Sequence, residues 1–132
     1  MENSNFTQLE LYRKALDIFR VSRGIACVVS NSKHIIEMDI STNNNEQVAG
    51  EIVTHSLKLV PELAAIQNSA TKGGRLKRVK KIQKLARLIN AKCRKLENAG
   101  TRDREFLILL LAELKHFDQL FNDWLNKIQL KH

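Results

Sequence analysis

Apolar residues recur at intervals of three and four along most of the chain, which is the spacing of one face of an α-helix. The most regular run predicts a helix over residues 75–98, with its apolar face at Val79, Ile82, Ala86, Ile89, Cys93 and Leu96. A second run predicts a helix from about residue 101 to 128, with its apolar face at Leu107, Leu110, Leu114, Phe117, Phe121, Trp124 and Ile128.

The N-terminal half predicts two more helices. Residues 1–5 form a polar tail, and Thr7 and Glu10 have the T-x-x-E spacing of a capping box at the start of a helix that runs to residues 30–32. We expect this helix to bury Leu9, Tyr12, Leu16, Phe19, Ile25, Ala26 and Val29. Residues 33–45 are expected to be an irregular connection.

A further helix is predicted to begin at Asn45 or Glu46, and Pro61 lies inside its apolar pattern. Proline removes a backbone donor and crowds the preceding turn. The alternatives are therefore a kink between residues 57 and 61 or two abutting helices. Residues 68–74 are expected to form a turn with Gly73 and Gly74 as helix breakers.

At the end of the 75–98 helix, Gly100 is a natural left-handed cap. Thr101 is then expected to cap the last helix. Four such helices joined by short links predict an all-α fold, namely an antiparallel up-down four-helix bundle in which residues 1–132 form a single domain.

Composition adds a strong positive charge to this picture. The formal net charge is +8, with 22 Lys and Arg against 14 Asp and Glu. Such a balance favours a polyanionic partner, which can be RNA, DNA or an anionic membrane surface. Cys27 and Cys93 are far apart in helical contexts and are expected to be buried thiols. The polar start lacks the features of a signal peptide and no apolar run reaches 18 residues, so a cytoplasmic protein that does not span a membrane is expected.

Half of the Lys and Arg residues lie between Lys72 and Lys95, and no Asp or Glu occurs between Glu62 and Glu97. With Val79 at heptad position a, most of these cations fall at positions b, c and f, opposite the apolar face. Arg78 and Lys92 flank them at position g. The predicted nucleic-acid-binding residues are Arg75, Lys77, Arg78, Lys80, Lys81, Lys84, Arg87, Lys92, Arg94 and Lys95.

Several functions are compatible with this cationic face. Contacts to phosphates would be directed to the backbone and sensitive to salt, because no aromatic residue lies between Phe19 and Phe106 to stack on bases. The alternatives are a solvated surface, a docking face for an acidic protein or a neighbouring subunit, and an anionic membrane surface.

No catalytic constellation is recognisable, so we expect a protein that is not an enzyme and needs no cofactor. Glu113 and His116 have the Glu-x-x-His spacing of di-iron bundles, but a second copy is missing, and nothing completes a site around Glu51 and His55. Ser22, Ser30 and Ser56 lack a base and an orienting group. Gly73 and Gly74 precede a helix start that could admit a phosphate, although a plain turn is the simpler interpretation.

Residues 49–72, 75–96 and 101–128 (AGEIVTHSLKLVPELAAIQNSATK, RLKRVKKIQKLARLINAKCRKL and TRDREFLILLLAELKHFDQLFNDWLNKI) resemble a known group of four-helix bundles. The group contains the accessory variability determinant of diversity-generating retroelements and the proteins encoded by intervening sequences of bacterial 23S ribosomal RNA genes. Trp124 and Lys127 match its C-terminal pattern, whereas Asp123 stands where the group usually has glycine.

The resemblance implies a protomer that assembles into a ring-like homopentamer with a basic surface. It also implies a partnership with a reverse transcriptase and its template RNA during mutagenic complementary-DNA synthesis. From the residues themselves, the apolar excess of the last helix also indicates an oligomer. We expect Leu109, Leu120, Trp124 and Leu125 at that interface, unless the helix containing Pro61 covers them.

Overall fold

The structure is a computed structural model that describes residues 2–30, 43–100 and 104–128. In these residues the chain forms only helices: α1 (Glu2–Ser30), α3 (Asn44–Leu57), α4 (Leu59–Asn68), α5 (Lys72–Asn98) and α6 (Arg104–Lys127). The prediction of an all-α bundle is confirmed. Thr101 and residues 33–42, for which a cap and most of an irregular connection were predicted, lie outside the described residues.

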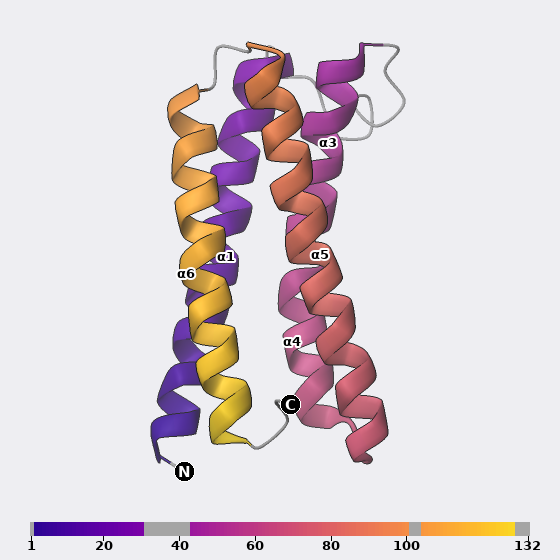
Figure 1. Ribbon diagram of the computed structural model, residues 1–132, viewed down its shortest axis with the longest axis vertical. Helices are drawn as coiled ribbons and strands as arrows, with labels where there is room; N and C mark the ends of the chain where they lie inside the picture. The colour runs from indigo at the N-terminus through magenta and orange to yellow at the C-terminus, as the bar shows by residue number, and fades with distance from the viewer. Residues whose placement is uncertain (1, 31–42, 101–103, 129–132) are drawn as a thin grey trace.

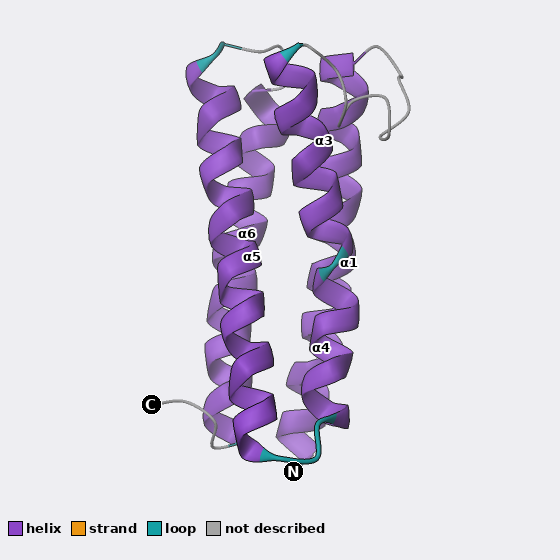
Figure 2. Cartoon of the chain, turned by 90° about the vertical axis from the view of Figure 1, so that its right-hand side faces the viewer, coloured by secondary structure: helices purple, strands orange, loops and turns teal. Residues whose placement is uncertain are grey.

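The helices lie side by side along the long axis of the molecule (Figure 1). Helix α1 packs against α6 on one side and against α3 and α4 on the other, and α5 packs against α3, α4 and α6. Helices α1 and α5 therefore occupy opposite corners of the bundle. Figure 2 shows that the chain between α4 and α5 turns at one end of the molecule.

Pro61 divides the second predicted helix into two abutting helices. Helix α3 ends at Leu57 and α4 begins at Leu59, with Lys58 between them. Proline at residue 61 cannot donate to the carbonyl of Leu57, so the hydrogen-bond ladder cannot continue through this point. The amide of Lys58 instead donates to the carbonyl of His55, and Pro61 lies in the first turn of α4, where no donor is needed.

Helix α1 differs from its prediction in its first residue and in which side of the helix is buried. It begins at Glu2, so residues 2–5 belong to the helix, and Thr7 is a buried residue rather than a cap. The buried face consists of Thr7, Leu11, Ala15, Ile18, Ser22, Ile25 and Ala26. Leu9 and Leu16 are 50% and 43% exposed, because the face toward α3 and α6 includes small and hydroxyl side chains that the apolar pattern does not reveal.

Cys27 is exposed while Cys93 is buried, so the prediction of two buried thiols is wrong for Cys27. Cys27 is about five turns from Leu9 along α1 and falls on the same outward side of the helix. Its exposure is a direct consequence of the corrected face of α1.

Helix α5 begins three residues earlier than predicted. Thr71 is its N-cap, and the Thr71 hydroxyl accepts a hydrogen bond from the amide of Gly74 at 3.0 Å. Gly73 and Gly74 therefore lie in the first turn of the helix rather than in a preceding turn. At the other end Gly100 has φ +70°, which confirms the predicted left-handed cap.

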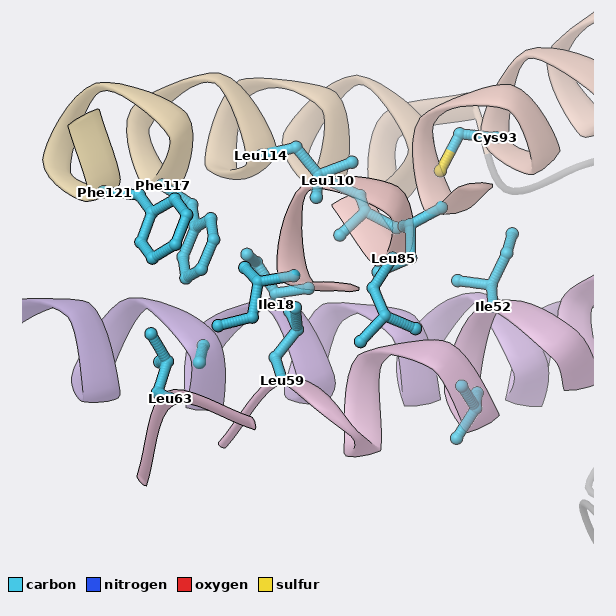
Figure 3. Packing of buried hydrophobic residues seen from close by; sticks show 14 of the residues in the cluster. Ile18, Ile52, Leu59, Leu63, Leu85, Cys93, Leu110, Leu114, Phe117 and Phe121 are labelled. Carbon is cyan, nitrogen blue, oxygen red and sulfur yellow. The ribbon is translucent and has the colours of Figure 1, made fainter. Parts of the chain in front are cut away.

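All four sides of the bundle contribute to one core. Figure 3 shows Ile18 from α1, Ile52, Leu59 and Leu63 from α3 and α4, and Leu85 from α5, together with Leu110, Leu114, Phe117 and Phe121 from α6. The rings of Phe117 and Phe121 are stacked with centroids 5.8 Å apart. Because all six residues of the predicted apolar face of α5 are buried, the rotation of the helix about its own axis is fixed and its cations face outward in a defined order.

Candidate nucleic-acid interface

The buried face of α5 is the one predicted. Val79, Ile82, Ala86, Ile89, Cys93 and Leu96 are all buried, and Leu85 joins them. The remaining surface of the helix divides into a side facing α3 and α4, a side facing α6, and an outward side between them. The predicted basic residues are distributed over these sides and do not act as one set.

The cations facing α3 and α4 are held by carboxylates from those helices. The two carboxylate oxygens of Glu62 form ion pairs with Arg78 at 3.3 Å and with Lys81 at 3.0 Å. Glu51 accepts Lys92 at 3.1 Å, and the Lys92 side chain is only 18% exposed. Arg78, Lys81 and Lys92 thus form ion pairs that join α5 to α3 and α4.

Two other predicted contacts are also engaged locally. The guanidinium of Arg75 donates to the carbonyl of Ser69 at 3.3 Å, across the turn that precedes α5. Arg94 pairs with Glu97 on its own helix at 3.0 Å. The absence of acidic residues between Glu62 and Glu97 in the sequence therefore did not mean that the cations of α5 lack carboxylate partners.

The outward side carries what we call the cationic stripe, consisting of Lys77, Lys80, Lys84, Arg87 and Lys95. All five are exposed. Among the described residues none of the five makes an ion pair or a side-chain hydrogen bond, in contrast to the cations on either side of them. Their spacing follows one line along the helix, over roughly 27 Å of helical rise.

A groove of about 580 Å³ lies between α5 and α6, immediately beside the cationic stripe. Arg87 belongs to both features. Gln83 and Asn90 line the α5 wall, Asp118 and Asn122 line the α6 wall, and Phe121 contributes a buried aromatic surface. Asp118 is exposed, but partial desolvation still raises the pKa of its carboxyl above the usual value of 3.8.

The sequence pattern could not place this groove. Phe121 and Asn122 are about 35 positions from Arg87 along the chain, and only the packing of α6 against α5 brings them beside it. Phe121 lies beside the cationic face in space but is only 2% exposed, so it does not offer a ring face for stacking on bases.

The residues expected at an oligomer interface lie in different environments. Trp124 and Leu125 are 3% and 1% exposed within a single chain, and Leu120 packs against the core. Leu109 is 46% exposed, and it lies next to two other exposed apolar residues, Ile108 at 53% and Phe106 at 39%. Of the four predicted residues, Leu109 is the one available to a second molecule.

The remaining polar candidates have structural surroundings. Ser22 and Ser56 are buried, and their hydroxyls are hydrogen-bonded to each other. Glu113 forms an ion pair with Lys14 of α1 at 3.0 Å. Within residues 2–30, 43–100 and 104–128, no group of three or more His, Cys, Asp or Glu side chains is arranged to hold a metal ion. In the same residues no helix is both long enough and apolar enough to cross a membrane.

Comparisons with known proteins identify no relative. A scan against protein-family models, a search of curated proteins and a search of solved structures each found no match.

Proposed function

We propose that this protein is a non-enzymatic nucleic-acid-binding protein whose cationic stripe on α5 contacts phosphates. The observation that carries the proposal is the division among the cations of α5. Those beside α3 and α4 have carboxylate partners, whereas Lys77, Lys80, Lys84, Arg87 and Lys95 share one exposed line with no partner among the described residues.

Placing like charges along one face has an electrostatic cost. Cations three and four positions apart on a helix repel each other, as Lys77, Lys80 and Lys84 do here. Carboxylates of neighbouring helices are within reach of α5, since Glu51 and Glu62 contact its flank. A face left entirely cationic is therefore well suited to a polyanion that supplies the negative charge in trans.

The size of the stripe sets the expected salt dependence. Each phosphate contact lowers the slope of log K against log salt by about 0.7 for a single strand or 0.9 for a duplex, so five contacts predict a slope of roughly −3.5 to −4.5. Binding by a stripe of exposed Lys and Arg depends little on base sequence.

The test is charge reversal with a matched control. The triple variant Lys77→Glu, Lys80→Glu, Lys84→Glu is compared with Arg13→Glu, Lys58→Glu, Lys115→Glu, which changes net charge equally at exposed positions on other parts of the bundle. Binding of labelled RNA and DNA oligomers is measured at several salt concentrations. We expect the first variant to lose binding and the second to keep most of it. Equal losses in both variants would contradict a role for the stripe.

A second candidate function is docking of an acidic protein on the same face. The ion pairs of Glu62 show that cations of α5 can donate to carboxylates at 3.0 to 3.3 Å. If the parent protein binds no oligomer at low salt, yet the stripe variant loses a protein partner in a pull-down, this second function replaces the first.

The biological setting that we propose rests on the resemblance noted above. The protein would act in the cytoplasm as an accessory to a reverse transcriptase and its template RNA, as an up-down bundle repeated in a ring-like homopentamer. The exposed apolar side chains Phe106, Ile108 and Leu109 on α6 support an interface between subunits. Multi-angle light scattering tests the ring, and a monomer at all concentrations would exclude it.

A further inference from the structure

We propose that the groove between α5 and α6 is a nucleobase subsite, which takes one unpaired guanine from a single strand whose phosphates lie along the cationic stripe. This inference rests on the proposed function, and it adds a strand type and a base preference to it. The carrying observation is that the stripe and the groove adjoin and share Arg87.

The shape of the stripe favours a single strand. It is straight and extends over roughly 27 Å of helical rise. A duplex turns through a full rotation in about 34–36 Å, so its phosphates would move away from a straight line of cations within that length. A flexible single strand can follow the line and can turn its bases to one side, where the groove lies.

The groove offers both kinds of hydrogen-bonding group. Arg87 on α5 supplies only donors, Asp118 on α6 supplies acceptors, and the amides of Gln83, Asn90 and Asn122 supply both. Among the described residues, none of these five side chains makes a hydrogen bond or ion pair to protein. Arg87 and Asp118 in particular line one groove without pairing with each other.

Guanine matches this arrangement better than the other bases. Its N7 and O6 acceptors suit a bidentate guanidinium, while its N1 and N2 hydrogens suit a carboxylate. Adenine lacks the O6 acceptor, and uracil and cytosine lack N7. Phe121 and Ala86 form the floor of the groove but are only 2% and 5% exposed, so discrimination among bases rests on the polar groups of its walls.

The experiment measures base preference within each protein. Twelve-nucleotide RNA oligomers of repeating UUG, UUA, UUC and UUU are bound to the parent, to Asp118→Asn and to Asp123→Asn. Asp123 is a matched control, because its replacement removes the same charge from the same helix outside the groove. Taking the ratio of UUG to UUU affinity within one protein cancels the general electrostatic effect of removing a carboxylate.

In the parent we expect UUG to bind about fivefold or more tightly than UUU. The ratio should fall toward one in Asp118→Asn and stay unchanged in Asp123→Asn. Replacing guanine by inosine, which lacks the N2 amine, should weaken the parent's preference without affecting Asp118→Asn.

The outcomes separate the two proposals. Equal binding of all four oligomers by the parent would overturn the guanine subsite and leave the phosphate-contacting stripe intact. A preference for UUG that persists in Asp118→Asn would also overturn the subsite. No binding of any oligomer at low salt would overturn both.

Discussion

The hydroxyl oxygens of Ser22 on α1 and Ser56 on α3 lie 2.7 Å apart in the interior of the bundle. Ser22 also lies 2.7 Å from the carbonyl of Ile18, and Ser56 lies 2.8 Å from the carbonyl of Ile52. Each hydroxyl has one hydrogen, so only two of these three contacts are hydrogen bonds at any moment. One serine donates to the other while the second donates to its own helix.

This sharing predicts strongly coupled mutations. Ser22→Ala should lower the free energy of unfolding by about 0.5–1.5 kcal/mol, since Ser56 can still donate to Ile52. The double variant Ser22→Ala, Ser56→Ala should lower the free energy of unfolding little more than either single change, because each single change already removes the hydrogen bond between the two hydroxyls. Urea unfolding of all four proteins measures this coupling, and additive losses would mean that the hydroxyls act independently.

Lys14 on α1 and Glu113 on α6 form the least exposed ion pair that joins these helices in the described part of the chain, with side chains 16% and 19% exposed. Glu113→Leu should destabilise the protein by about 1–3 kcal/mol because it leaves a poorly hydrated ammonium, with Asp17 as its remaining carboxylate at 3.8 Å. Adding Lys14→Met should recover much of the loss. Arg20→Met, which breaks an exposed pair with Asp17, is the control and should cost less than about 0.5 kcal/mol.

Gly24 lies where α6 comes close to α1. A Cβ at this position would be 3.1 Å from Cε1 of Phe106, a ring that is 39% exposed and can move outward. Alanine is favoured over glycine in a helix by about 1 kcal/mol. Gly24→Ala should therefore raise the stability by this full amount only when Phe106→Ala is also present. Thermal melts of the parent, the two single variants and the double variant should show a larger stabilisation by Gly24→Ala in the Phe106→Ala background. An identical gain in both backgrounds would contradict the contact.

The two thiols should react at different rates. Cys27 is exposed and Cys93 is 0% exposed. A thiol reagent should modify one cysteine per chain quickly in the native protein and the second only in denaturant. Cys27→Ser is expected to abolish the fast phase, whereas a fast phase that survives this change would place Cys93 at the surface.

Asp118 should make stability depend on pH. Its pKa is raised in the folded protein by burial, so the folded state binds a proton more readily than the unfolded chain. The cost of holding the carboxylate is present at neutral pH and is relieved as pH falls through the raised pKa. Asp118→Asn should be slightly more stable than the parent at pH 7, and the difference should shrink in acid. Asp123→Asn serves as the control in urea unfolding.

The sequence pattern predicted α5 and α6 well because their buried faces consist of large apolar residues at regular spacing. It failed for α1 because Thr7, Ala15 and Ser22 belong to the buried face while Leu9 and Leu16 do not. The Thr7 hydroxyl accepts from Lys127 at 2.7 Å, and the Ser22 hydroxyl contacts Ser56 in addition to the carbonyl of Ile18 on its own helix. Partners of this kind become visible only when the helices are packed.

The candidate site shows the same limit. Charge counting found the basic residues of α5, but it could not separate those that stay open from those held by Glu51 and Glu62, which come from other helices. The amides and Phe121 in the groove are ordinary helix residues by sequence. Their position in one groove follows from the packing of α6 against α5.

The cationic stripe on α5 has no partner among the described residues, and this links the proposed binding of a polyanion to the stability of the fold. Mutual repulsion along Lys77, Lys80 and Lys84 opposes folding, and a polyanion that binds the folded stripe more tightly than the unfolded chain offsets that repulsion. The melting temperature of the unlabelled protein should therefore rise with added polyanion. A simple thermal shift can then rank RNA, DNA and acidic polypeptides as ligands before the natural partner has been identified.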